Sequence, residues 1–193
     1  LELGMQVKDG QLTCTQSGRI KDAQRLLALT QLAVQAAGCL AGPANTQERL
    51  ARNAIEDPEP RFRKQCLETL LGRYSSHELS LPTARAALED KYAAIRLVGA
   101  RFVGAPAQPV VEAIVRGRGL PDALHAEAVR CLTAIAKDQD SAGEAARSVL
   151  PEAADQTRGA LFELITRLQL DVPSSELSPR AGDSDATLIA LCK

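Results

Sequence analysis

Residues 50–72 read LARNAIEDPEPRFRKQCLETLLG, and this stretch decides the fold. Apolar residues recur at helical spacing on both sides of Asp57-Pro58, which interrupts the pattern. Pro60 suits the first turn of a second helix, because the amide hydrogen that proline lacks would have no partner there. The segment therefore predicts two helices joined by a short turn.

The same pattern returns along the chain. Residues 84–104 repeat it, and a distance of six residues from aspartate to arginine is shared by two pairs, Asp57 with Arg63 and Asp90 with Arg96. Two further units carry His125 and Arg158 at the arginine position, so the steps are 33, 29 and 33 residues. Repeats of this length are typical of stacked helix pairs. We therefore expect an all-α fold, a solenoid of antiparallel helix pairs in a right-handed superhelix, over residues 43–170.

The composition agrees with a helical fold. The chain has 193 residues, of which 32 are alanine and 27 leucine, while aromatic residues make up 3% and tryptophan is missing. Alanine and leucine favour helices, whereas sheets draw on aromatic and β-branched residues. The net charge of −1 disfavours a dedicated nucleic-acid binder, which needs a basic surface.

The motif of residues 50–72 resembles the HEAT repeat family, and most of all the bacterial repeats with the pattern Leu-Leu-x-Asp-x-x-Pro-x-Val-Arg followed by an alanine-rich helix that ends in Leu-Gly. Residues 84–104 match it less fully, and the last two units match through their second helices. The resemblance implies a solenoid that scaffolds other proteins. It also implies an architectural role for the motif residues Asp57, Arg63, Asp90 and Arg96. Each aspartate can accept hydrogen bonds from the start of the next helix, and each arginine can bridge to it or to a neighbouring repeat.

The segments outside the repeats have their own patterns. Residues 1–18 alternate around an Asp-Gly turn and predict a β-hairpin, which either packs its apolar face on the next helix or belongs to a sheet upstream. Residues 19–42 predict a capping helix. Residues 171–193 predict a flexible linker, centred on residues 180–185, and a short apolar tail.

Two helix starts carry the spacing of a capping box, in which a serine or asparagine at the first position faces a glutamate three residues later. Asn45 with Glu48 predicts a helix over residues 47–56. Ser141 with Glu144 predicts another over residues 142–150.

No residue pattern predicts catalysis, a metal or a cofactor. A family of HEAT-like hydroxylases holds iron with repeated His-Glu pairs, but this chain has one such pair, His77-Glu78, and two histidines in all. The five cysteines are scattered without a Cys-x-x-Cys pair, which indicates reduced thiols in a cytoplasmic protein. The chain has no run of eighteen apolar residues, the length that would predict a membrane-spanning helix. Seventeen arginines against six lysines, with abundant alanine, indicate a bacterial source.

We therefore expect a non-catalytic interaction module whose partner is a protein or peptide. The alternative is an enzyme or an enzyme-assembly factor, such as a HEAT-type chromophore lyase or an alkylpurine DNA glycosylase. The partner surface is expected along the second helices of the repeats, where corresponding positions form a strip of mixed charge. Its candidate residues are Lys64, Glu68, Leu97, Arg101, Glu127, Arg130, Glu163 and Arg167.

Overall fold

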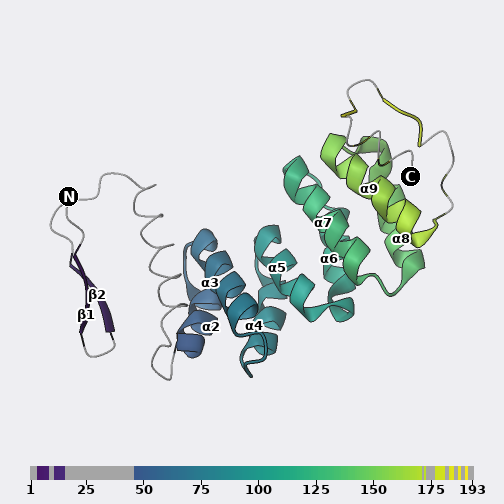
Figure 1. Ribbon diagram of the computed structural model, residues 1–193. Helices are drawn as coiled ribbons and strands as arrows, with labels where there is room; N and C mark the ends of the chain where they lie inside the picture. The colour runs from purple at the N-terminus through teal and green to yellow at the C-terminus, as the bar shows by residue number, and fades with distance from the viewer. Residues whose placement is uncertain are drawn as a thin grey trace. The chain divides into compact units, whose positions relative to one another are not determined.

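The computed structural model describes most of the chain after residue 45 and two short segments before it, namely residues 4–8, 11–15, 46–170, 172, 177–180, 183–184, 187 and 190 (Figure 1). The capping helix expected over residues 19–42 lies outside these residues. The chain divides into two compact units, Leu1–Thr83 and Ala84–Lys193.

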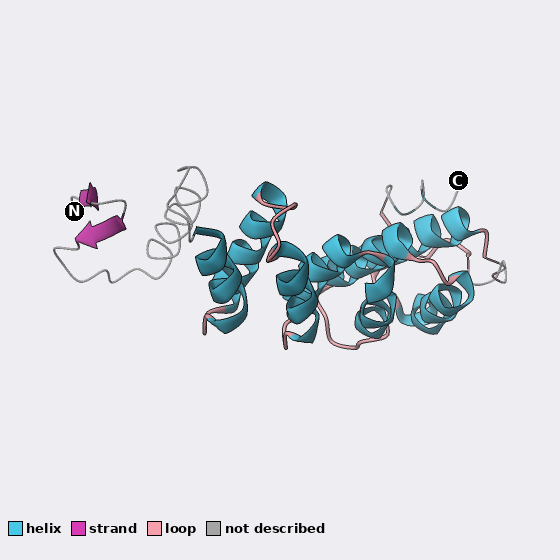
Figure 2. Cartoon of the chain, turned by 90° about the horizontal axis from the view of Figure 1, so that it is seen from below, coloured by secondary structure: helices cyan, strands magenta, loops and turns pink. Residues whose placement is uncertain are grey.

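The first unit contains two paired strands. Strands β1 (Gly4–Lys8) and β2 (Gln11–Thr15) run antiparallel and are drawn in magenta in Figure 2. Their register sets Met5 opposite Cys14 and Val7 opposite Leu12. The packing predicted for the apolar side chains of this hairpin lies outside the part of the structure that is described.

Helices α2 (Thr46–Glu56) and α3 (Pro60–Arg73) pack on each other in the same unit. Helix α3 begins at Pro60, as the sequence predicts, and the Glu59 side chain accepts a hydrogen bond from the Arg61 amide at 3.4 Å. The buried apolar residues of this pair are Leu50, Ala54, Cys66, Leu67, Leu70 and Leu71. Helix α4 (Ser80–Ala86) leads across the boundary into the second unit.

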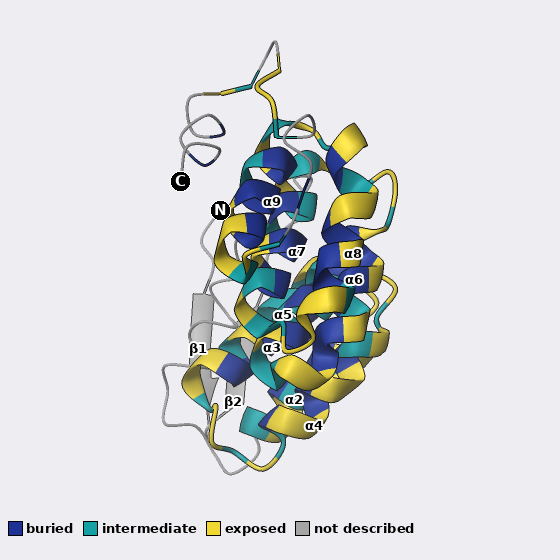
Figure 3. Ribbon diagram, turned by 90° about the vertical axis from the view of Figure 1, so that its right-hand side faces the viewer, coloured by how far each residue is buried: buried dark blue, intermediate teal, exposed yellow. Residues whose placement is uncertain are grey.

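Residues 84–170 of the second unit form helices joined by short loops and turns. Its elements in chain order are η1 (Ala87–Glu89), α5 (Ala93–Val103), η2 (Ala105–Ala107), α6 (Gln108–Val115), α7 (Asp122–Ile135), α8 (Gln139–Val149), η3 (Leu150–Glu152) and α9 (Asp155–Leu168). Helix α7 packs between α5 and α9, while α6 contacts α7 and α8 contacts α9. The sides on which these helices meet are buried (Figure 3).

Small residues let these helices approach closely. A Cβ atom added to Gly99 on α5 would lie 2.6 Å from the Ala84 carbonyl oxygen, so only glycine fits this contact. Alanines fill corresponding positions elsewhere in the core, whereas α9 adds larger side chains, among them Leu161 and Phe162. The alanine-rich composition therefore serves close helix packing as well as helix formation.

The second of the two predicted capping boxes is wrong. Helix α8 begins at Gln139, and its cap is Asp138, whose carboxylate accepts a hydrogen bond from the Ser141 amide at 3.1 Å. The Ser141 hydroxyl instead donates to the Glu112 carboxylate at 2.7 Å, across to α6. An aspartate three residues earlier competes for the same role, because its carboxylate is as good a cap as a hydroxyl. The first box includes Asn45, which lies outside the described residues.

The segment after α9 is predicted from the sequence to be a flexible linker with a short apolar tail. Its described residues are bound to the second unit: the Arg180 guanidinium donates to the Leu150 carbonyl oxygen at 3.2 Å, and Thr187 and Ala190 are buried. Polar and small residues suggest a linker by composition, but here they make hydrogen bonds and close contacts. We call the described residues 177–180, 183–184, 187 and 190 the 177–190 segment.

Candidate interaction surface

The repeat alignment made from the sequence corresponds to one position in four helices. Counting from the first residue of α3, α5, α7 and α9, the fourth residues are Arg63, Arg96, His125 and Arg158. By the same count, the ninth residues are Glu68, Arg101, Arg130 and Glu163. The predicted register of the repeats is therefore the register of these helices.

The fourth-position residues act within the architecture. Arg63 is buried and donates to the Asp57 carbonyl oxygen at 2.7 Å, across the turn that precedes α3. A His125 ring nitrogen lies 2.5 Å from the carbonyl oxygen of Val115, the last residue of α6. Arg158 differs, because its partner follows its own helix in the chain and does not precede it. Its guanidinium donates to the carbonyl oxygen of Ser178, a residue after α9.

The motif aspartates accept hydrogen bonds from the starts of the helices that follow them, as predicted, although neither aspartate is the N-cap residue. The Asp57 carboxylate accepts from the Glu59 amide, and the Asp90 carboxylate accepts from the Tyr92 amide, both at 2.9 Å. Glu59 is the N-cap residue of α3, and Tyr92 is the N-cap residue of α5. These bonds satisfy amide groups that a helix start leaves without partners.

A strip of charged side chains runs over three neighbouring helices. Arg101 on α5 and Glu127 on α7 form an ion pair at 3.0 Å, which joins two helices that pack together. Arg130 on α7 is exposed, as are Glu163 and Arg167 on α9. We call these five residues the α5–α7–α9 strip.

The remaining candidate residues do not join this strip. Leu97 is fully buried in the core of the second unit, so its prediction as a surface residue is wrong. Ala126, which holds the corresponding fifth position of α7, is buried as well. Lys64 and Glu68 form an ion pair at 3.1 Å on α3 in the other unit, where they neutralise each other.

A buried polar network that the sequence analysis missed joins α6 to the start of α8. The Gln108 amide group accepts from the amides of Lys137 and Asp138 at 2.8 and 3.1 Å, and donates to Glu112 at 2.8 Å. The 500 Å³ cavity beside it is lined by these residues and Ser141. Every polar group of the Gln108 side chain is thus engaged, so this network holds α6 to the residues that lead into α8. Its signal in the sequence is Gln108 with Glu112, one helical turn apart.

Two cysteines, Cys66 and Cys131, are buried. Burial, reinforced by the Asp57 charge, raises the pKa of the Cys66 thiol to about 11, which keeps it protonated. Burial also raises the pKa of the Cys131 thiol, although the neighbouring Arg101 opposes this. A second cavity, of 300 Å³, has polar and charged residues in its lining, namely Arg116, Arg118, Asp122, His125, Ser148, Glu152 and Thr157.

The described residues contain neither a metal-ligand cluster nor a helix suited to span a membrane. No three His, Cys, Asp or Glu side chains there gather closely enough to hold a metal ion. His77, the residue of the His-Glu pair, accepts a hydrogen bond from the Leu79 amide at 3.3 Å within its own turn. None of the described helices has the length and apolar character that crossing a bilayer requires.

Comparison of this chain with known protein families, with curated proteins and with solved structures finds no match.

Proposed function

We propose that this chain is a non-catalytic interaction module built of HEAT-like repeats, and that a protein or peptide partner binds along the α5–α7–α9 strip. The observation that carries the proposal is the shared register of the exposed charges. Arg101, Arg130 and Glu163 occupy the ninth position of three helices that pack side by side. Corresponding positions of neighbouring parallel helices lie next to each other, so the charges form a continuous row.

The charge pattern of the strip favours a protein over a nucleic acid. Three arginines alternate with two glutamates, and Arg101 is already paired with Glu127. A phosphate backbone would need cations without interspersed carboxylates. A polypeptide carries both signs and can match such a row, with gains in specificity and association rate.

The test reverses two charges of the strip. We expect Arg101→Glu with Arg130→Glu to remove partner binding, because the introduced glutamates would repel the partner's carboxylates that the two arginines attract. A matched control reverses Arg85 and Arg118, which are exposed outside the strip. Binding partners recovered with the unaltered chain should be recovered with the control variant and lost with the strip variant, as measured by quantitative affinity purification.

A second variant separates binding from folding. Exchanging Arg101→Glu with Glu127→Arg keeps an ion pair between α5 and α7 but inverts its direction. Exposed ion pairs contribute only about 0–1 kcal/mol, so the melting temperature should change by no more than a few degrees. Partner binding that survives both the double reversal and the exchange would show that the strip is not the binding surface.

A further inference from the structure

The start of α7 holds the start of α9 through one carboxylate. Asp122, the first residue of α7, accepts hydrogen bonds from the amides of Gln156 and Thr157, each at 2.9 Å, and from the Thr157 hydroxyl at 2.6 Å. The same hydroxyl lies 3.3 Å from the Asp122 carbonyl oxygen. Thr157 is fully buried by this contact. The carboxylate thus caps a helix other than its own.

The start of α9 holds the 177–190 segment in the same way. Asp155, the first residue of α9, accepts hydrogen bonds from the Ser184 amide at 2.8 Å and the Thr187 hydroxyl at 2.7 Å. The Thr187 hydroxyl also lies 3.0 Å from the Asp155 carbonyl oxygen. Thr187 therefore occupies at α9 the place that Thr157 occupies at α7.

The surroundings of the two threonines correspond as well. The residue four positions after each aspartate is small, Ala126 in α7 and Gly159 in α9. A Cβ atom on Gly159 would lie 3.1 Å from the Thr187 hydroxyl oxygen, so the segment sits directly on this glycine. Three residues after each threonine is a buried alanine, Ala160 or Ala190.

The two contacts differ in what supports them. Helix α9 brings fully buried leucines and Phe162 against its neighbours, whereas the 177–190 segment adds the partly buried Leu177 and a few small residues. The segment also covers Arg158, whose guanidinium is 1% exposed. Its Nε lies 3.4 Å from the Asp183 carboxylate without hydrogen-bond geometry, and its Nη1 donates to no atom of the described residues. Buried donors without acceptors oppose burial.

We propose that the face of α9 bearing Asp155 and Gly159 is a docking site for a helix start that carries threonine, and that the chain's own 177–190 segment occupies it as a releasable cap. The site recognises its occupant by a carboxylate that accepts an amide and a hydroxyl, and by a glycine that leaves room for them. The cap closes the face through which α9 would otherwise contact a further helix of this kind.

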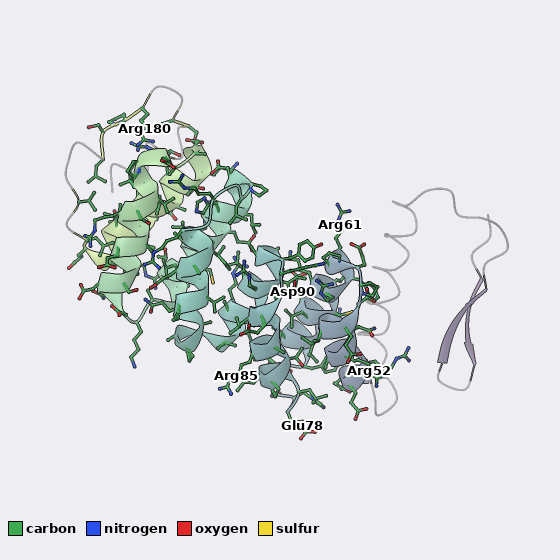
Figure 4. All side chains as sticks on the ribbon, turned by 180° about the vertical axis from the view of Figure 1, so that it is seen from behind. Arg52, Arg61, Glu78, Arg85, Asp90 and Arg180 are labelled. Carbon is green, nitrogen blue, oxygen red and sulfur yellow. The ribbon has the colours of Figure 1, made fainter. Side chains whose placement is uncertain are left out.

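Trypsin gives a direct readout, because Arg180 lies in the segment and its guanidinium is held against the Leu150 carbonyl oxygen (Figure 4). The rate of cleavage after Arg180 in the whole chain is measured by mass spectrometry. A synthetic peptide of residues 174–190 supplies the rate for an undocked segment. We expect the unaltered chain to be cleaved at least about tenfold more slowly than the peptide.

Variants at the two aspartates then separate release of the cap from general unfolding. Asp155→Asn and Thr187→Val should each raise cleavage after Arg180 by about tenfold while the unfolding midpoint stays nearly constant. The matched control Asp122→Asn weakens the corresponding bonds one helix earlier, and should lower the midpoint instead. The proposal is overturned if the unaltered chain is cleaved as fast as the peptide, or if Asp155→Asn leaves the cleavage rate unchanged.

Discussion

The contact between α7 and α9 and the contact between α9 and the 177–190 segment use the same chemistry with different support. In both, the first aspartate of a helix accepts an amide and a threonine hydroxyl from the next element. In the first contact a whole helix follows the threonine into the core. In the second, only a short segment does. Hydrogen bonds thus set the register of both contacts, whereas apolar burial decides which of them can open separately.

The electrostatics of the two aspartates reflect this difference. Burial opposes ionisation of Asp122, but the Thr157 hydroxyl and the amides of Gln156 and Thr157 outweigh it, so the pKa of Asp122 lies below its ordinary value. The Ser184 amide, with the hydroxyls of Thr187 and Ser184, lowers the pKa of Asp155. Both carboxylates are therefore ionised at neutral pH and serve as strong acceptors.

The largest expected effect concerns the apolar support of the first contact. Leu161→Ala on α9 removes a fully buried side chain and should lower the free energy of unfolding by about 2–5 kcal/mol, measured by urea denaturation. The comparison variant Leu177→Ala truncates a partly buried leucine of the 177–190 segment and should change it by less than about 1 kcal/mol. Equal losses for the two variants would remove the distinction between the contacts.

The next effect tests the carboxylate of the first contact. Asp122→Asn should lower the free energy of unfolding by about 1–2 kcal/mol, because the charge-assisted bonds to the start of α9 weaken. Thr157→Val, which removes one donor and keeps the shape, should cost about 1 kcal/mol. Both are measured by the same denaturation experiment. A midpoint unchanged in both variants would mean that Asp122 does not hold α9.

A smaller effect follows from the glycine beneath Thr187. Gly159→Ala places a methyl group 3.1 Å from the Thr187 hydroxyl oxygen, so tryptic cleavage after Arg180 should accelerate. The control Gly72→Ala lies on α3, where an added Cβ would meet no atom within 4 Å. It should stabilise the chain by about 0.5–1 kcal/mol through helix propensity and leave cleavage after Arg180 unchanged. Equal cleavage in both variants would show that the segment does not rest on Gly159.

The smallest expected effect is a dependence on pH. A carboxyl group whose pKa is lowered by folding stabilises the fold above its unfolded pKa, near about 4, and this stabilisation is lost as the pH falls through the folded value. The melting temperature should therefore drop below about pH 4, and less steeply in the variant with both Asp122→Asn and Asp155→Asn. Asp140→Asn, at an exposed position of α8, is the control and should follow the unaltered chain.

Much of the helical register could be predicted from the sequence. The alignment of Arg63, Arg96, His125 and Arg158 survives as a common fourth position, because the spacing of apolar residues and the turn prolines constrain where helices begin. The hydrogen bonds of Asp57 and Asp90 to the starts of the next helices followed from the same pattern. The burial of Leu97 could not be predicted from this pattern, because whether a given helix position is buried or exposed depends on which helix packs against it.

The contacts of the 177–190 segment could not be predicted from composition alone. Glycine, serine, proline and aspartate between residues 174 and 185 resemble a linker, and the repeat pattern was not carried past α9. A signal was present: Asp-x-Thr occurs at residues 155–157 and again at 185–187, a spacing of 30 residues. The cap of α8 was misplaced for a related reason, because Asp138 and Ser141 both satisfy the rules for a cap and only the contact with Glu112 decides between them.

Hydrogen exchange of the unaltered chain tests the central claim most directly. The Ser184 amide, bound to Asp155, should exchange at least about tenfold more slowly than in the peptide of residues 174–190, through a local opening that depends weakly on urea. The amides of Gln156 and Thr157, bound to Asp122, should exchange far more slowly and with the steep urea dependence of global unfolding. A Ser184 amide that exchanges at the rate of the peptide would contradict the account.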